Sequence, residues 1–330
     1  MADTFRALYA EQVDGKPLVK LTSLGDDALP PGDVTLDVTY SSLNYKDGLA
    51  LTNKGKILRK LPLVPGIDVA GTVRASTSPR FKPGDAVFAT GWNMGESLWG
   101  GFTQRTRLKA DVLQHLPAGL DAKRAMAIGT AGFTAMLCVQ ALEDAGSLKS
   151  GREAVVTGAG GGVGSVAVAL LAALGQKVVA STGRAELGDW LRSLGAASIL
   201  DRAELSQKGP PLAPERWGAG VDSVGSQTLA TVLSQTAYNS AVAACGLAGG
   251  PDMVGTVFPF ILRGVKLLGV ESVMVPMDRR ERAWKRLLEL IPREKLDGIT
   301  SVVPMSRLLE VAPDIVAGKT RGRVVVDVNA

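Results

Sequence analysis

The chain has 330 residues, of which 46% are hydrophobic and 21% are charged, which is an ordinary globular composition. This length suffices for two domains of common size, each with its own core. The formal net charge is +5, but the basic residues are scattered and aromatic residues make up only 5% of the chain. The composition therefore does not indicate a nucleic-acid-binding protein.

The chain has too few cysteine and histidine residues for a disulfide scaffold or for a zinc site built from these side chains. The two cysteines, Cys138 and Cys245, and the single histidine, His115, exclude a disulfide scaffold and a zinc site built from several such ligands. The N-terminus MADTFRALYAEQ is too polar for a signal peptide, and no apolar run is expected to reach the ~20 residues of a membrane span. We expect a protein of the reducing cytoplasm with no membrane partner.

The first ~125 residues have the pattern of an all-β unit. Val34, Leu36 and Val38 alternate with polar residues, and the turn sequences PPGD, VPGID and KPGD follow at short intervals. Short strands between such turns predict a barrel-like domain.

From about Ala125 the pattern changes to apolar strands alternating with helices. Six strands with intervening helices predict a doubly wound parallel sheet. The strands are expected at 154–157, 177–181, 198–201, 221–224, 241–245 and 266–270. An amphipathic helix is expected over 278–291, and the terminal GRVVVDVN is a strand that need not belong to this sheet.

The segment VVTGAGGGVGSVAVALLAALG has the order strand, glycine turn and helix. Ala159, Gly161 and Gly164 form a relaxed version of the G-x-G-x-x-G fingerprint, with alanine in the first place. Glycines let backbone N–H groups approach phosphate oxygens, and the helix N-terminus adds partial positive charge. The segment therefore predicts a dinucleotide site.

The following strand ends in Ser181, Thr182, Gly183 and Arg184, without the carboxylate that would bind a free ribose 2′-hydroxyl. Hydroxyl groups and a guanidinium can instead bind a 2′-phosphate through charge-assisted hydrogen bonds. We therefore expect NADP(H) in preference to NAD(H), with Arg202 as a second candidate for this phosphate.

Six motifs together resemble the medium-chain dehydrogenase/reductase superfamily in its zinc-free, quinone-oxidoreductase-like branch. They are SSLNYKDGLA, LPLVPGIDVAGTV, IGTAGFTAMLCV, VTGAGGGVGSVAV, VDSVG and GKTRGRVVVDV, and they cover nearly the whole chain. Within that branch LNYKDGLA, PFILRGVKLLGVESVM and AWKRLLE look most like NADPH-dependent acryloyl-CoA reductases.

The resemblance implies an α/β protein in which a Rossmann sheet is joined to a GroES-like β-barrel catalytic domain. The catalytic domain would comprise residues 1–125 and 275–330, and the NADP-binding domain residues 126–274. It also implies an active site in the cleft between them, and a homodimer joined near Val270–Met274.

The sequence departs from the zinc-containing members at their ligand positions. Those members have a cysteine in the early strand, a His-Glu pair after Pro-Gly and a lobe with four cysteines. This chain has Asn44-Tyr45 and Ile67-Asp68 and no cysteine lobe, so we expect no metal.

Without a Lewis acid, hydride addition to the β-carbon of an enone or enoyl thioester is favoured, because backbone N–H groups and one hydroxyl can hold the enolate. Protonation of the α-carbon then needs a positioned acid or water. Tyr45 is the leading candidate for the catalytic residue beside the nicotinamide, with Asn44 orienting the same groups. Asp47 is expected to act in catalysis or, equally, to cap the helix that LNYKDGLA begins. Asp68 is expected to be a structural carboxylate and not an acid catalyst.

The resemblance also implies a set of cofactor contacts. They are Tyr45, Thr130, Gly161, Gly162, Val163, Gly164, Ser165, Ser181, Thr182, Gly183, Arg184, Arg202, Leu247, Ile261 and Ser272, with plain core packing as the alternative for the apolar ones. A coenzyme A ester would bring phosphates of its own, and Lys56 and Arg59 in the basic run 54–60 are candidates to meet them, unless that run is only a solvated face.

Three functions follow from these observations. The first is NADPH-dependent reduction of acryloyl-CoA to propanoyl-CoA, and the second is reduction of quinones or simple enones in the same site. The third is a dinucleotide-binding structural or sensing protein without turnover.

Overall fold

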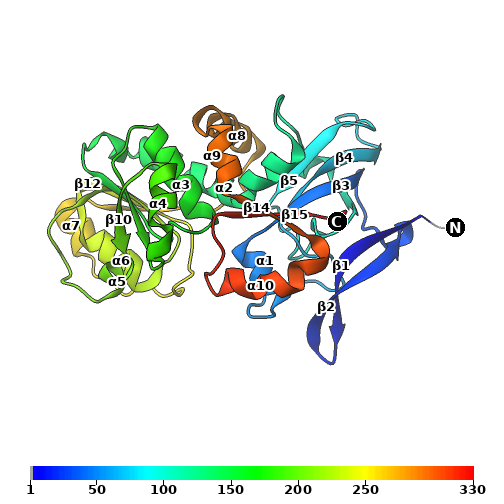
Figure 1. The fold of residues 1–330 in the computed structure, drawn as a ribbon, viewed down its shortest axis with the longest axis horizontal. Helices are drawn as coiled ribbons and strands as arrows, with labels where there is room; N and C mark the ends of the chain where they lie inside the picture. The colour runs from blue at the N-terminus through cyan, green and yellow to red at the C-terminus, as the bar shows by residue number, and fades with distance from the viewer. Residues whose placement is uncertain (1–2) are drawn as a thin grey trace. The chain divides into compact units, whose positions relative to one another are not determined.

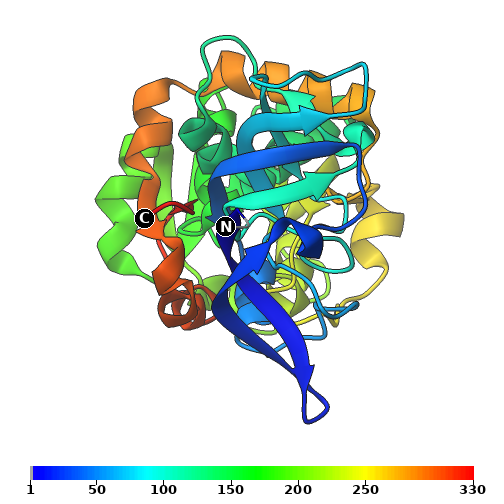
Figure 2. The same ribbon diagram turned by 90° about the vertical axis from the view of Figure 1, so that its right-hand side faces the viewer.

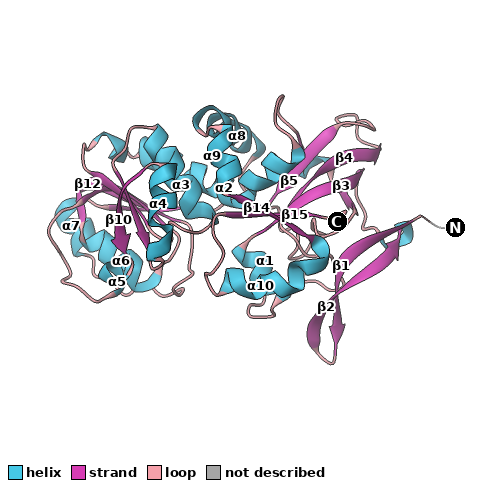
Figure 3. Ribbon diagram, in the orientation of Figure 1, coloured by secondary structure: helices cyan, strands magenta, loops and turns pink. Residues whose placement is uncertain are grey.

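The computed structural model describes residues 3–330, which divide into two compact units. Of the described residues, the first unit comprises 3–130 and 296–330, and the second comprises 131–295. Figure 1 shows the chain from N- to C-terminus, and Figure 3 shows that strands dominate the first unit while helices flank the sheet of the second.

The first unit is built on a seven-stranded sheet with the order β14-β15-β3-β4-β5-β7, to which β6 adds by pairing with β3. A separate long hairpin of β1 and β2 extends away from this sheet (Figure 2). The elements are β1 (Thr4–Val13), β2 (Lys16–Gly25), η1 (Asp26–Ala28), β3 (Val34–Leu43), α1 (Tyr45–Leu51), β4 (Asp68–Ser76), β5 (Ala86–Thr90), β6 (Arg105–Leu108), η2 (Ala110–Val112), β7 (Gln114–His115), β14 (Thr300–Pro304), η5 (Met305–Arg307), α10 (Leu308–Val316) and β15 (Arg323–Asp327).

The alternation in β3 follows its burial. Val34, Leu36 and Val38 lie in the core of the first unit, whereas Asp37 between them is half-exposed. The C-terminal strand β15 pairs antiparallel with β3 and parallel with β14. The last strand of the chain therefore belongs to the first sheet and not to the parallel sheet.

The second unit has a six-stranded parallel sheet with the order β10-β9-β8-β11-β12-β13 and helices on both faces (Figure 1). All six predicted strands are confirmed to within a few residues. The elements are β8 (Glu153–Val156), α3 (Gly162–Ala173), β9 (Val178–Thr182), η4 (Ala185–Leu187), α4 (Gly188–Leu194), β10 (Ala196–Asp201), α5 (Ala203–Ser206), β11 (Trp217–Asp222), α6 (Ser226–Ser234), β12 (Thr236–Ala244), α7 (Phe258–Arg263), β13 (Lys266–Gly269) and α8 (Met277–Leu290), with η3 (Ser147–Lys149) before β8.

The boundary near residue 275 differs from the sequence-based one. Helix α8 lies in the second unit, and the chain enters the first unit only at residue 296, within α9 (Arg293–Gly298). The reason is visible at Arg280, a fully buried residue whose guanidinium donates to the carbonyl oxygens of Ser272, Val273 and Val275. These bonds fasten α8 to the segment that follows β13.

Helix α2 (Ala122–Asp144) corrects the expectation that no apolar run reaches the length of a membrane span. It is long and apolar enough by length and composition, but 83% of its most apolar window is buried inside the protein. Burial of this kind is typical of a core helix. The helix is interrupted at Gly129, whose φ of 48° is non-helical, so the apolar residues on either side of it do not form one straight run.

Candidate active site

The glycine loop of the second unit has the geometry of a phosphate cradle. It joins β8 to α3, with Gly158 at a φ of 59° and Gly161 as the residue before the helix. A Cβ on Gly164 would lie 2.3 Å from the carbonyl oxygen of Gly158, so only glycine lets the helix approach the loop this closely. Gly162 and Val163 in the first turn of α3 are partly exposed, which leaves their backbone accessible to a ligand.

Two guanidinium groups lie at the carboxyl end of β9. Arg184 donates to the carbonyl oxygen of Gly160 at 3.4 Å, and a Cβ on Gly183 would meet Nε of Arg202 at 2.3 Å. Thr182 stands at the end of the strand and accepts a hydrogen bond from the backbone N–H of Arg184 through its hydroxyl. A hydroxyl and two cations at this point fit an adenosine ribose that carries a phosphate.

The remaining predicted cofactor contacts of the second unit have different surroundings. Leu247 follows β12 and is 55% exposed, and Ile261 is 69% exposed, so plain core packing is wrong for both. Ser272 follows β13 and accepts a hydrogen bond from the Thr134 hydroxyl at 2.8 Å. Ile261 lies on α7, between β12 and β13. The other predicted cofactor contacts lie at the ends of two elements. Gly161 precedes α3, Ser165 lies in the first turn of α3, and Ser181 and Thr182 are the last residues of β9.

In the first unit, Asp68 is the centre of a buried hydrogen-bond network. Its side chain is inaccessible to solvent, and it accepts bonds from the Ser42 hydroxyl at 2.5 Å and the Asn44 amide at 2.9 Å. The backbone N–H and hydroxyl of Thr130 donate to the same carboxylate at 2.9 and 2.5 Å. Asp68 is thus a structural carboxylate, as the sequence suggested, and Thr130 is held by it.

Arg323 completes this network from the start of β15. Its guanidinium is 2% exposed and donates to Oδ1 of Asn44 at 3.1 Å and to the Ser42 hydroxyl at 3.0 Å. It also donates to the carbonyl oxygens of Met126 and Ala127 in α2. Burial lowers the pKa of this guanidinium, and the nearby charges of Asp68 and Asp47 act in the opposite direction.

Sequence reasoning did not single out Arg323. The available signal was a charged residue at the head of an otherwise apolar strand, RVVVD. A charged group in that position is buried only when it has partners.

Asp47 holds the first turn of α1, the helix that Tyr45 begins. Its carboxylate accepts bonds from the backbone N–H groups of Asn44 at 2.9 Å and Ile67 at 3.0 Å. The helix-cap interpretation of Asp47 is therefore confirmed. Burial raises the pKa of Asp47 to about 7, and the charge of Asp68 adds to this effect, although the hydrogen bonds from Asn44 and Ile67 oppose it.

The two candidate catalytic residues differ in their freedom. Asn44 is 7% exposed, and both ends of its amide are engaged, with Asp68 and Asp47 as acceptors and Arg323 as donor. Tyr45 is half-buried. Asn44 is therefore suited to fix the start of α1. Tyr45 is the first residue of that helix, and its side chain remains partly accessible.

One member of the basic run 54–60, Arg59, forms an ion pair with a carboxylate of the first unit. Glu96 is 3% exposed and pairs with Lys46 at 2.7 Å and with Arg59 at 3.5 Å. Arg59 and Lys56 are both exposed, and Arg59 is paired with a buried carboxylate. Within residues 3–330 no group of three or more His, Cys, Asp or Glu side chains is placed to hold a metal ion.

Both halves of the chain match known family models. Residues 30–118 match the alcohol dehydrogenase GroES-like domain, and residues 162–293 match the family described as zinc-binding dehydrogenase.

Relatives extend this similarity along the whole chain. The probable acrylyl-CoA reductase AcuI of Escherichia coli is 52% identical, covering 98% of this chain and all of the relative. The acrylyl-CoA reductase AcuI of Ruegeria pomeroyi is 50% identical over 99% of this chain and all of the relative. "Putative quinone oxidoreductase YhfP" of Bacillus subtilis is 42% identical over 99% of both chains.

A solved structure has the same fold together with a dinucleotide. The crystal structure of Escherichia coli YhdH with bound NADPH has a TM-score of 0.95 and 52% identity, covering 98% of this chain and all of that chain. The Rossmann and GroES-like architecture expected from the sequence is therefore confirmed.

The raised pKa of Asp47 predicts a characteristic pH dependence of stability. Because folding favours the protonated carboxyl, its contribution is complete below the ordinary pKa of 3.8 and is lost as the pH rises through about 7. Relative to Asp47→Asn, the free energy of unfolding of the unmodified protein should fall by up to about 1.4 kcal/mol per pH unit across this window. Urea unfolding of both proteins at half-unit steps from pH 5 to 8 measures the difference, and parallel curves would contradict it.

Proposed function

Because the chain belongs to the medium-chain dehydrogenase/reductase superfamily, we propose that it catalyses the NADPH-dependent reduction of acryloyl-CoA to propanoyl-CoA. The observation that carries this proposal is the identity of 50–52% to acrylyl-CoA reductases over the full length of both chains. The site residues are consistent with it, because each group that the reaction needs has a candidate among them.

The second unit supplies the residues that would hold NADP(H). The N–H groups of Gly162, Val163 and Gly164 at the start of α3 would bind the pyrophosphate. Arg184 and Arg202 would bind the 2′-phosphate at the end of β9. Thr130, Leu247, Ile261 and Ser272 are proposed to meet the nicotinamide half. When bound, the reduced nicotinamide supplies a hydride.

The first unit supplies the proposed donor to the substrate. Hydride addition to the β-carbon leaves negative charge on the thioester oxygen, and a hydroxyl group can stabilise that enolate without a metal. Tyr45 is proposed for this role or for contact with the carboxamide or ribose, and Asn44 fixes it. That the reaction proceeds without a metal remains a prediction from the residues at the zinc-ligand positions. The proton for the α-carbon comes from a positioned acid or from water.

Lys56 and Arg59 remain proposed contacts of the coenzyme A phosphates. The pairing of Arg59 with Glu96 makes Lys56 the stronger of the two. If the basic run is only a solvated face, replacing Lys56 and Arg59 should leave the affinity for coenzyme A esters unchanged.

Reduction of quinones or simple enones is the second candidate function. It is supported by the 42% identity to a protein named as a quinone oxidoreductase, but that identity is lower than the identity to the acrylyl-CoA reductases. A binding protein without turnover is the third possibility, and only an activity measurement separates it from the first two.

A substrate comparison tests the proposed function. Oxidation of NADPH, followed by absorbance, should be fast with acryloyl-CoA and at least tenfold lower in kcat/KM with a short quinone and with a simple enone. Equal rates on all three would support the general enone reductase. Fluorescence-detected NADPH binding with no oxidation on any of them would support the non-catalytic protein.

The assignment of the 2′-phosphate site makes a separate prediction. Arg184→Ala should raise KM for NADPH about tenfold or more while changing KM for NADH by less than about twofold, because only NADPH carries the phosphate. Arg192→Ala is a matched control, since Arg192 is an exposed residue of the same unit paired with Asp189. Equal changes for both dinucleotides would remove Arg184 from the phosphate site.

The cytoplasmic location and the homodimer also belong to this proposal. Strand β13 lies at the edge of its sheet, and the exposed apolar residues Phe258, Leu262 and Met274 lie before and after it in the chain. Pairing of two such edges would cover these side chains. Sedimentation velocity should give about twice the mass of one chain, and a monomer at micromolar concentration would refute the dimer.

A further inference from the structure

The loop that follows β13, residues 271–275, is held from two sides by charged side chains. One of them is Arg280 of α8, which is fully buried. Its guanidinium donates to the carbonyl oxygens of Val273 at 2.8 Å, Val275 at 2.9 Å and Ser272 at 3.3 Å. A single cation therefore orients three backbone acceptors of one short loop.

The second charged side chain is the Glu271 carboxylate, which accepts bonds from N–H groups of the same loop. It binds the backbone N–H of Val273, and it binds that of Met274 at 2.9 and 3.1 Å through its two oxygens. Like the bonds of Arg280, these are charge-assisted, and such bonds are stronger than bonds between neutral groups. The conformation of loop 271–275 is thus fixed through both its carbonyl oxygens and its N–H groups.

Two neighbouring residues of α2 contact the same arrangement. Cζ of Arg280 lies 5.0 Å from the centroid of the Phe133 ring, and the Thr134 hydroxyl donates to that of Ser272 at 2.8 Å. A guanidinium that lies over an aromatic ring and is bonded to carbonyl oxygens has little freedom to move. Arg280 is therefore a rigid support for the loop.

The order of the strands places this loop on the nicotinamide side of the cofactor site. The residues proposed for the adenosine phosphate, Arg184 and Arg202, follow β9 and β10, and the glycine loop follows β8. In the sheet, β13 lies on the opposite side of β8 from β9 and β10. A dinucleotide crosses the carboxyl ends of the strands at the point where the strand order reverses. The loop after β13 would therefore face the nicotinamide half.

Ser272 of this loop keeps a backbone donor for a ligand. Its carbonyl oxygen accepts a bond from Arg280, and its residue is half-buried. Within residues 3–330, the backbone N–H of Ser272 donates to no group of the protein, whereas those of Val273 and Met274 donate to Glu271. The bonds of Arg280 and Glu271 therefore determine where the Ser272 N–H points.

We propose that Arg280 and Glu271 are positioning residues for the nicotinamide half of NADP(H), and that they act through the backbone of loop 271–275. Neither side chain has to touch the cofactor, because each holds peptide groups on which the proposed contact of Ser272 depends. The inference rests on the NADP(H) site of the proposed function. It adds to that site two residues that the sequence pattern did not single out.

Two ligands that share the adenosine half test the proposal. NADPH carries the nicotinamide half, whereas adenosine 2′,5′-bisphosphate lacks it. Arg280→Lys keeps the positive charge but loses the planar fork that reaches several acceptors at once, so the calorimetric Kd for NADPH should rise about tenfold or more. The Kd for the bisphosphate should change by less than about twofold, because sites that share no contacts contribute independently.

Glu271→Gln is the second variant, and it keeps the test available if Arg280→Lys does not fold. Glu271 is exposed, so its replacement buries no new polar group. Gln keeps an acceptor oxygen but loses the charge, so the Kd for NADPH should rise by less, about threefold, and the Kd for the bisphosphate should not change. In both variants the fluorescence lifetime of bound NADPH should shorten toward that of the free cofactor, because the reduced ring is held less firmly.

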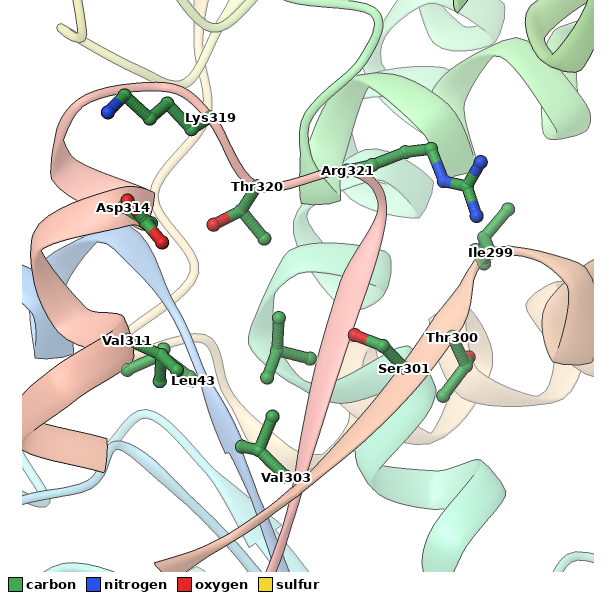
Figure 4. A pocket seen from close by; sticks show the side chains of 11 residues that line it. Leu43, Ile299, Thr300, Ser301, Val303, Val311, Asp314, Lys319, Thr320 and Arg321 are labelled. Carbon is green, nitrogen blue, oxygen red and sulfur yellow. The ribbon is translucent and has the colours of Figure 1, made fainter. Parts of the chain in front are cut away.

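Three further variants serve as controls. Arg279→Lys and Glu281→Gln make the same exchanges at exposed positions of α8 and should leave both Kd values unchanged. Val311→Ala shortens a side chain of the first unit that lines a cavity of about 290 Å³ beside α10, β14 and β15 (Figure 4). It should lower the urea midpoint of unfolding without changing the ratio of the two Kd values, which separates a loss of stability from a loss of position.

An equal rise in Kd for NADPH and the bisphosphate, or unchanged binding of NADPH in both variants, would overturn the proposal. The proposed function fails in a different way. If the unmodified protein binds both ligands but does not reduce acryloyl-CoA, the proposed reaction is wrong, and the two Kd values still decide the role of the loop. If the unmodified protein does not bind NADPH, both proposals are wrong.

Discussion

Burial of two carboxylates and one guanidinium in the first unit constrains everything around them. Asp47, Asp68 and Arg323 are each 2% exposed or less, and a charge so far from water is tolerated only when partners satisfy it. The partners here are Ser42, Asn44, Thr130, the backbone N–H of Ile67 and carbonyl oxygens of α2. Ser42 binds both Asp68 and Arg323, and Asn44 binds all three charged groups. A change at either of these two residues therefore disturbs the whole set.

The same network explains an irregularity in the backbone. Gly129 adopts a φ of 48° within α2, and a Cβ there would lie 2.6 Å from both the guanidinium of Arg323 and the carboxylate of Asp68. A glycine at this position lets the helix pass against the charged groups, and Thr130, the next residue, can then bind Asp68 with both its N–H and its hydroxyl. Asp68, which follows Pro65-Gly66-Ile67, thus has its carboxylate bonded to donors of the protein itself.

The features predictable from the sequence were those set by neighbouring residues. The strands of the second unit, the glycine loop and the helix begun by Tyr45 all depend on short-range patterns, and the structure has each of them. The pairing of Arg323 with Asn44 joins residues 279 positions apart, so no local pattern reveals it. The entry of the chain into the first unit was misplaced because α8 has a charged, amphipathic sequence that fits either unit. Buried hydrogen bonds from Arg280 to the carbonyl oxygens of Val273 and Val275 hold α8 in the second unit.

Basic residues that are scattered in the sequence can still come together in the fold to form a site for an anion. Apart from the basic run 54–60, the positive charges are scattered along the sequence. Arg184 and Arg202 follow the paired parallel strands β9 and β10, whose carboxyl ends lie at the same edge of the sheet. The fold thus brings cations that are distant in the sequence to one edge of the sheet, where we propose that they bind the 2′-phosphate.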